Sequence, residues 1–210
     1  MRRTEKDILG TKELSEETLY GINTARALEN FALGQEKMNR NLVRAIVIVK
    51  KAAATTYLKL KIGNEDVESA IIKACNRVLD GECDMEACFP LQALQGGAGT
   101  SANMNVNEVL ANLALLEMGH KPGEYDVIHP LDDVNRGQST NDVYPTALRL
   151  AAIRQLRLLS DACAKLQTAF QEKENLWQDV EKLGRTELMD AVPVTMGEEF
   201  GSYAQALARD

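Results

Sequence analysis

Two short stretches of uncharged polar residues stand out, because each lies where an apolar helical pattern begins. The first runs from Gln95 through a glycine-rich segment to Thr100, Ser101 and Asn103, and the second covers residues 138–142. Glycines let the backbone approach a ligand closely, and the first turn of a helix presents unpaired N–H groups at the positive end of its dipole. Hydroxyl and amide side chains add hydrogen bonds without adding charge. The pattern predicts two helix N-termini suited to a substrate with two carboxylates.

Helix capping is the simpler interpretation of either stretch taken alone. Ser, Thr, Asn and Asp cap helices for purely local reasons. Ser139 and Asp142 even have the spacing of a capping box, in which the serine hydroxyl would be bonded to the backbone rather than to a ligand. The presence of both stretches in one chain weakens the interpretation as capping alone.

Composition excludes several classes of protein. The 210 residues are 45% hydrophobic, enough for one sizeable core or a core with an extension. A formal net charge of −7, without a basic run among aromatic residues, argues against nucleic-acid binding. The N-terminus has no apolar signal core, which predicts a cytoplasmic protein. No membrane span is expected, because the most apolar window, residues 41–60, is interrupted by four basic residues: Arg44, Lys50, Lys51 and Lys59.

The cysteines and histidines do not predict a metal site. The cysteines at 75, 83, 88 and 163 form no C-x-x-C pair, and both histidines, His120 and His129, fall in a predicted loop. We interpret the cysteines as reduced thiols, with Cys75 and Cys163 on apolar helical stripes.

Helical periodicity dominates the chain, and strand signals are confined to short pieces before Phe31. Asn64 is expected to cap a helix that ends at Gly81. A second helix, stopped by Gly119, is expected to present one apolar face, made of Val106, Val109, Leu110, Leu113 and Leu116.

The longest helical pattern runs from about Pro145 to Trp177. Its apolar residues recur at alternating steps of four and three, the seam of a helix in a left-handed bundle: Ala152, Leu156, Leu159, Cys163, Leu166 and Phe170. A turn around Gly184 follows, and then a helix from Thr195 whose Glu198 completes a capping box. Because these pieces cannot cover the seam, we interpret the chain as a fragment whose missing helices come from absent sequence or other subunits.

A third polar cluster, residues 184–195, is predicted to be a loop that carries one cation, one hydroxyl and two carboxylates. A pairing of Arg185 with Asp190 that holds the turn is as good an interpretation as a binding role.

Four segments together resemble, in order and spacing, the N-terminal half of the aspartase/fumarase superfamily, most closely its aspartase branch. They are residues 26–31, 96–108, 138–146 and 184–193, and the likeness covers essentially the whole chain. The resemblance implies a mainly α fold, with an N-terminal lyase domain over residues 1–140 and the first helices of a long central bundle over 141–210. Four subunits would pack as a homotetramer, with each site built from three chains.

The same resemblance implies the reaction, which is the reversible anti elimination of ammonia from L-aspartate to give fumarate. The substrate is a small dicarboxylate or amino acid, and neither a metal nor an organic cofactor is required. Aligned N–H and O–H donors suit this chemistry, because abstraction of a proton next to a carboxylate builds negative charge on that carboxylate.

Site residues can be carried over position by position. Thr100 resembles the hydroxyl that helps hold one substrate carboxylate. Ser139, Thr140 and Asn141 resemble the segment that binds the same end of the substrate. Thr186 resembles the residue that contacts the other carboxylate from a neighbouring subunit. The family's catalytic serine lies in a G-S-S-x-M-P-x-K-x-N motif, which is not in these residues, so no catalytic residue is assigned and the chain alone is expected to be inactive.

Glu187 departs from the family pattern, which has histidine there in the fumarase branch and often glutamine or another polar residue in aspartases. A carboxylate at this position would repel a substrate carboxylate but could attract a leaving ammonium. It therefore favours an amine-bearing substrate over malate. The alternatives are fumarate hydratase activity, or a non-catalytic fragment or assembly module of the same fold.

Overall fold

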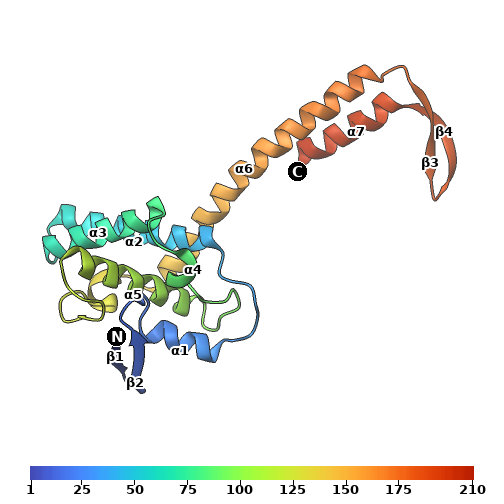
Figure 1. The fold of residues 1–210 in the computed structure, drawn as a ribbon. Helices are drawn as coiled ribbons and strands as arrows, with labels where there is room; N and C mark the ends of the chain where they lie inside the picture. Colours follow the sequence, from blue (N-terminus) through green and yellow to red (C-terminus); the bar gives the residue numbers. More distant parts are fainter. The chain divides into compact units, whose positions relative to one another are not determined.

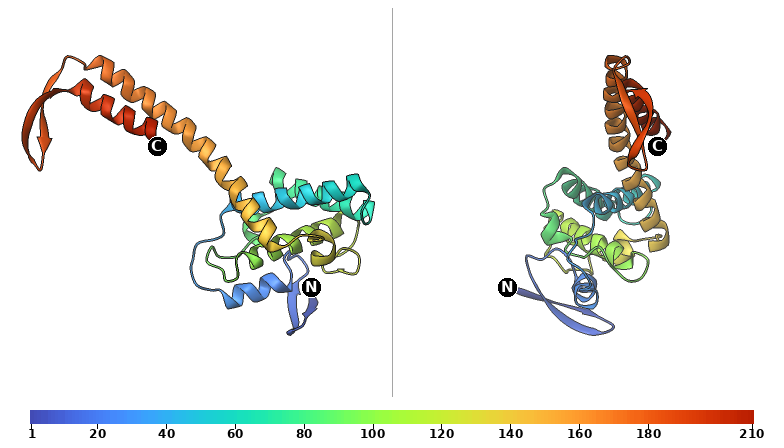
Figure 2. Two further views of the ribbon diagram at one scale, coloured as in Figure 1. Left: turned by 180° about the vertical axis from the view of Figure 1, so that it is seen from behind. Right: turned by 90° about the vertical axis from the view of Figure 1, so that its right-hand side faces the viewer.

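The computed structural model describes all 210 residues, which form two compact units, Met1–Ala151 and Ala152–Asp210 (Figures 1 and 2). The first unit contains β1 (Arg2–Asp7), β2 (Gly10–Ser15), α1 (Ile22–Asn30), α2 (Arg40–Leu60), α3 (Glu65–Asp80), α4 (Met85–Cys88), α5 (Thr100–Glu117), the π-helix η1 (Pro130–Val134) and the start of α6 (Thr140–Leu176). The second unit contains the rest of α6, β3 (Glu181–Thr186), β4 (Met189–Thr195) and α7 (Met196–Arg209). The expected mainly α fold is confirmed.

The predicted domain boundary at residue 140 coincides with the start of α6, whereas the compact units divide within that helix, after Ala151. The assignment of residues 141–210 to a bundle domain stays a prediction. None of the helices combines the length and the apolar character that crossing a membrane requires.

Helix α5 forms the centre of the first unit, with α1 on one side and α2 and α3 on the other (Figure 1). The sequence predicts a single apolar face for this helix, but the structure buries it on almost every side. Of the predicted face, Val106, Val109 and Leu110 are fully buried, whereas Leu116 is 42% exposed. The predicted residues from Val106 to Leu113 are buried as expected, but the limitation to one face was wrong, because packing partners on both sides bury α5 all round from Ala102 to Leu115.

Glu108, on α5, holds the start of α1 in place. Its carboxylate is 1% exposed and accepts hydrogen bonds from the backbone N–H groups of Gly21 (2.9 Å) and Asn23 (2.8 Å) and from the Thr24 hydroxyl (2.6 Å). The N-cap residue of α1, Gly21, has no side chain with which to cap the helix. A carboxylate from a different helix therefore satisfies the N–H groups that a local cap normally satisfies.

The expected start and end of α3 and the expected start of α7 are confirmed. The Asn64 side chain accepts a hydrogen bond from the Asp66 N–H at the start of α3, and Gly81 ends that helix with a left-handed φ of 84°. At the start of α7, Thr195 and Glu198 form both hydrogen bonds of the predicted capping box. Helix α6 begins at Thr140 rather than near Pro145, and the proline lies inside its early turns.

Residues 184–195 form most of a β-hairpin, so the prediction of a loop there was wrong. β3 and β4 pair in antiparallel register, and the two turn residues, Glu187 and Leu188, have positive φ angles of 49° and 63°. Two-residue hairpins usually place Asn-Gly or similar residues at such positions, and Pro193 within a strand is also unusual. The sequence therefore lacked the usual signals of a hairpin. Arg185 and Asp190 lie opposite each other and form an exposed ion pair of 3.1 Å, as the structural interpretation expected.

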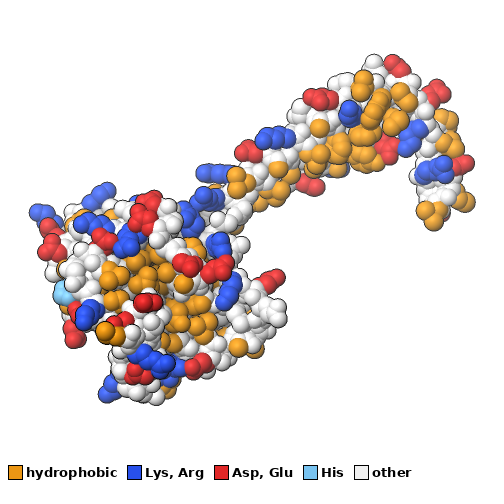
Figure 3. All heavy atoms as spheres, in the orientation of Figure 1, with side chains coloured by type: hydrophobic (Ala, Val, Ile, Leu, Met, Phe, Trp, Pro, Cys, Tyr) orange, Lys and Arg blue, Asp and Glu red, His pale blue; other side chains and the backbone are white.

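In the second unit, α7 packs on α6 through aromatic side chains. The Phe200 ring lies 5.9 Å from that of Phe170 and 5.0 Å from that of Trp177, measured between centroids. Most of the remaining predicted seam is uncovered within the chain, since Leu156 and Leu159 are 60% and 58% exposed. Figure 3 shows hydrophobic side chains at the surface of this helix.

Candidate functional site

The glycine-rich loop before α5 is shaped by close contact with α6. Gly97, Ala98 and Gly99 all have positive φ angles, of 71°, 47° and 89°. A Cβ atom on Gly99 would lie 2.3 Å from the ring of Tyr144, so only glycine fits there. Because Gly99 is the N-cap of α5 and has no side chain, no side-chain cap bonds the first N–H groups of this helix. The start of α5 thus has the features of an anion site.

The start of α6 is capped by Ser139, although not by the predicted capping box. The Ser139 Oγ accepts a hydrogen bond from the Asn141 N–H at 3.1 Å, and no return bond from Asp142 is formed. A serine hydroxyl that accepts one hydrogen bond still has its hydrogen to donate. Capping therefore occupies Ser139 only in part.

The two polar stretches meet in space although they are far apart in the sequence. The Asn103 side chain, 2% exposed, donates from Nδ2 to the Thr140 Oγ1 at 3.2 Å and to the Asn135 Oδ1 at 3.0 Å. Thr100 and Asn141 are exposed, and the Thr100 hydroxyl donates to the Gly97 carbonyl at 2.9 Å. The starts of α5 and α6 therefore present uncharged polar groups side by side.

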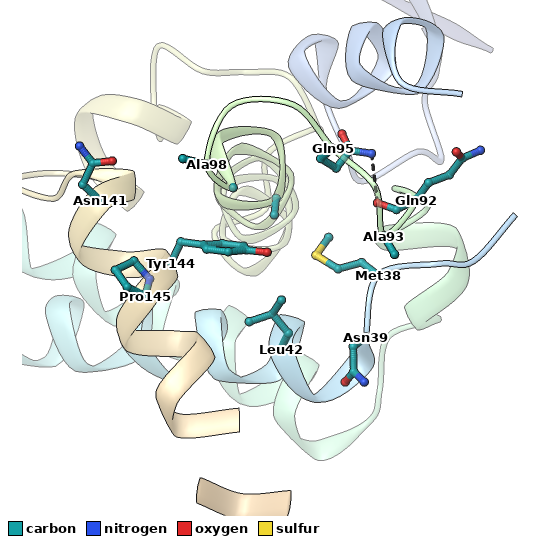
Figure 4. A pocket seen from close by; sticks show the side chains of 12 residues that line it. Met38, Asn39, Leu42, Gln92, Ala93, Gln95, Ala98, Asn141, Tyr144 and Pro145 are labelled. Carbon is teal, nitrogen blue, oxygen red and sulfur yellow. Dashed lines mark hydrogen bonds between the residues drawn. The ribbon is translucent and has the colours of Figure 1, made fainter. Parts of the chain in front are cut away.

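A cavity of about 590 Å³ opens beside this junction (Figure 4). Tyr144 reaches into it, Met38 and Leu42 contribute to its wall, and Asn141 lies at its edge. No charged residue lines the cavity, and neither do Thr100, Ser139 or Thr140. Its mostly apolar wall does not suit a dicarboxylate, so the polar junction, rather than the cavity, is the candidate carboxylate site.

Behind the junction lies Lys50, which the sequence analysis noted only as an interruption of an apolar window. Its side chain is 1% exposed, and its Nζ donates to the Asn135 Oδ1 at 2.7 Å and to the Gln138 Oε1 at 3.0 Å. Burial lowers the pKa of Lys50 to about 7. A signal for this position existed, because Lys50 follows the buried Ile46 and Val47 by four and three residues, on the same face of α2.

The other two predicted site residues belong to the second unit. Thr186 ends β3, and Glu187 is the first residue of the hairpin turn; both side chains are exposed. Glu187 does not pair with Arg185, whose partner is Asp190. The other four predicted site residues, Thr100, Ser139, Thr140 and Asn141, all belong to the first unit and lie at the junction of α5 and α6.

The four cysteines are free thiols, and the Sγ atoms of Cys83 and Cys88 lie 3.7 Å apart. The structure contains no cluster of three or more His, Cys, Asp or Glu side chains that could hold a metal ion. The groups available to a ligand at the junction are neutral hydrogen-bond donors and two helix N-termini, with one buried lysine behind them.

Comparison with known proteins connects this arrangement to a family. Residues 10–210 match the family model described as lyase. The chain is 46% identical to the aspartate ammonia-lyase of Escherichia coli (strain K12) over 211 aligned residues, which cover 99% of this chain and 44% of that protein.

Two solved structures have the same fold over the entire chain. A fumarate lyase:delta crystallin from Brucella melitensis has a TM-score of 0.93 and 47% identity, with 49% of that chain covered. A class II fumarase from Schistosoma mansoni has a TM-score of 0.89 and 35% identity, with 44% covered. The chain thus spans less than half the length of the proteins it matches. With its matched residues and the four motifs in register, it belongs to the lyase family of the aspartase/fumarase superfamily.

Proposed function

We propose that this chain supplies substrate-binding residues of an aspartate ammonia-lyase, which splits L-aspartate reversibly into fumarate and ammonia. The observation that carries the proposal is the junction at which Asn103 joins the start of α5 to Thr140 at the start of α6. This junction presents neutral donors and helix N-termini, as binding of a carboxylate requires. The aspartate ammonia-lyase of Escherichia coli, at 46% identity, supports the choice of reaction.

The proposed chemistry places one substrate carboxylate against Thr100, Ser139, Thr140 and Asn141. When a base removes the proton from the carbon next to this carboxylate, negative charge moves onto its oxygens. Donors fixed around those oxygens stabilise that charge, and the C–N bond then breaks to release ammonia. In this proposal Thr186 contacts the other carboxylate, and Glu187 attracts the amine that leaves.

The proposal extends to the assembly. The uncovered leucines of α6, including Leu156 and Leu159, support a homotetramer in which the long helices of the subunits pack together. We also propose that the protein acts in the cytoplasm, on small-molecule substrates.

The test is an assay of the full-length gene product for fumarate, followed by its ultraviolet absorbance, from aspartate and from malate in separate reactions. Fumarate formed from aspartate but not from malate supports the proposal. Fumarate formed from malate alone would replace it with fumarate hydratase activity. No fumarate from either substrate, with the protein folded and assembled, would favour a non-catalytic role.

A further inference from the structure

Lys50 is buried without an opposite charge, unlike the buried carboxylates of the same unit. Glu5 pairs with Arg3 at 2.9 Å and Glu68 with Arg136 at 3.0 Å, while Glu108 accepts several backbone N–H bonds. Lys50 is 1% exposed and donates only to neutral amide oxygens. An ammonium is costly to bury unless an anion accompanies it. The protonated form of Lys50 therefore has no opposite charge beside it in the structure.

The groups around Lys50 supply no anion. From α3 comes Cys75, and burial raises the pKa of its thiol to about 12, so this group is neutral near pH 7. The amides of Asn135 and Gln138 face Lys50 from the loop before α6.

Charged residues of the same elements are paired elsewhere or have the wrong sign. In the loop before α6, Arg136 is bound to Glu68 of α3 and to Asp133 of η1, at 3.0 and 2.6 Å. Lys51, beside Lys50 on α2, adds a like charge. A counter-charge for Lys50 must therefore come from outside the chain.

The position of Lys50 links it to the start of α6. Asn135 Oδ1 accepts from Lys50 at 2.7 Å, from Asn103 at 3.0 Å and from Asn107 at 3.3 Å, while its Nδ2 donates to the Gln138 carbonyl at 2.8 Å. An ammonium can only donate hydrogen bonds, so Lys50 fixes which end of the Asn135 amide faces it. The orientation of Asn135 in turn fixes that of Asn103, the residue bound to Thr140.

We propose that Lys50 is a positioning residue for a dicarboxylate at the junction of α5 and α6, with its ammonium orienting the amide network and its charge compensated by the bound dianion. This inference rests on the function proposed above. In this inference the substrate anion supplies the opposite charge that the buried ammonium of Lys50 does not have within the chain.

A bound anion would stabilise the protonated form of Lys50. Because burial alone lowers its pKa to about 7, a large share of the side chains is neutral just above that pH. Binding of a dianion would then be accompanied by uptake of a proton. A residue with a purely structural role would produce no such uptake.

The experiment measures proton uptake when succinate, a dicarboxylate without an amine, binds to the full-length gene product. Calorimetric titrations in buffers of different ionisation enthalpy give the number of protons taken up at about pH 8. The variants are Lys50→Met, which keeps the volume, and Lys50→Gln, which keeps a donor amide. Lys51→Met, one residue along the same helix, is the matched control.

We expect a measurable fraction of a proton per site in the wild type and in Lys51→Met, and none in the Lys50 variants, with succinate affinity reduced about tenfold or more. Uptake that persists in a folded Lys50 variant would overturn the inference. If both variants fail to fold, the wild type decides the question, because succinate binding without proton uptake between about pH 7 and 9 contradicts the inference. A wild type that neither binds succinate nor converts aspartate would instead refute the proposed function.

Discussion

The two units of the chain bury their apolar surface to very different extents. In the first unit, α2, α3 and α5 share a core in which Ile46, Ala74 and Leu110 are wholly buried. In the second unit Ala204 is the only buried hydrophobic residue, while Leu156 is 60% exposed. Because an exposed apolar stripe is costly in water, we expect the second unit to pack against a partner surface, whereas the first is held by its own core.

Polar groups follow the same division. In the first unit buried polar side chains join elements that are distant in the sequence, as Glu108 joins α5 to α1. In the second unit the ion pair of Arg185 with Asp190 joins neighbouring strands and is exposed. Buried polar contacts are expected to contribute far more to stability than exposed ones.

Replacement of Glu108 should have the largest effect and tests this difference directly. Glu108→Ala leaves several buried donors at the start of α1 without an acceptor, so the free energy of unfolding should fall by about 3–5 kcal/mol. Glu117→Ala is the control on the same helix, since Glu117 forms a partly exposed pair with Arg77 and should contribute about 0–1 kcal/mol. Urea unfolding of the chain gives both values, and equal losses would remove the distinction.

Catalysis should depend strongly on the junction in the first unit. In the full-length gene product, Thr100→Ala and Asn141→Ala should each lower kcat/KM by about 10- to 1000-fold. Asn141 would donate to the developing carboxylate charge, and Thr100 would do so once its hydroxyl turns from the Gly97 carbonyl to the substrate. Thr146→Ala, which removes an exposed hydroxyl on the same helix as Asn141, should leave the kinetics unchanged. Unaltered kinetics in both site variants, with the fold intact by circular dichroism, would mean that the two stretches only cap helices.

The pH dependence of stability should show that Lys50 titrates with a lowered pKa in the folded protein. Its pKa is lowered from 10.5 to about 7 in the folded protein, so the unfolded chain binds more protons above pH 7 and stability rises with pH there. Cys75 opposes this rise above about pH 9, because its thiol pKa is raised from 9.0 to about 12. Between about pH 7 and 9 the free energy of unfolding is expected to rise by about 2–3 kcal/mol, at about 1.4 kcal/mol per pKa unit.

Lys50→Met should abolish that gain and leave stability nearly level over the same range. Urea unfolding of wild type and variant at several pH values measures the difference between them. Parallel pH profiles would mean that Lys50 is not the titrating group.

Specificity should depend on the hairpin of the second unit. If Glu187 faces the substrate amine, Glu187→Gln in the full-length gene product should weaken the binding of aspartate relative to that of an analogue without the amine. The expected difference is about ten- to hundredfold, or about 1–3 kcal/mol. Glu187→His should shift preference toward malate. Glu181→Gln, elsewhere on the hairpin, is the matched control, and a ratio that changes by less than about twofold would leave Glu187 a solvent-facing turn residue.

Assembly should depend on the uncovered seam of α6, with little effect on the fold itself. The chain should self-associate, and Leu159→Glu should weaken association by at least about tenfold. The free energy of unfolding should change by no more than about 0.5 kcal/mol, since this side chain is already exposed. Leu158→Glu, equally exposed but off the seam, is the control in sedimentation experiments, and similar behaviour of the two variants would exclude the seam as the interface.

Local chemistry explains which parts of the fold were predictable from the sequence. The caps at Asn64 and Thr195 and the glycine at 81 act within one helical turn, and the structure has all three as predicted. The hairpin of β3 and β4 was missed because its turn contains Glu187 and Leu188, which rarely adopt positive φ. Residue propensity therefore did not predict the turn, and the antiparallel pairing of β3 with β4 holds these two residues in it.

The candidate site was predictable in its parts but not in its connections. Thr100 and Asn141 could be selected from residue type and from the resemblance. The link from Asn103 to Thr140 and the support from Lys50 depend on tertiary contacts that no spacing reveals. The spacing of Lys50 from Ile46 and Val47 indicated a buried position, but a lysine in an apolar run is normally interpreted as an exposed interruption, and its bonds to Asn135 and Gln138 are visible only in the structure.

The most direct test of the account is a crystal structure of the full-length gene product with bound succinate. We predict one carboxylate at the junction, within about 3 Å of the Thr100 hydroxyl and of donors among Ser139, Thr140 and Asn141. Succinate bound elsewhere, with the starts of α5 and α6 unoccupied, would contradict the central claim.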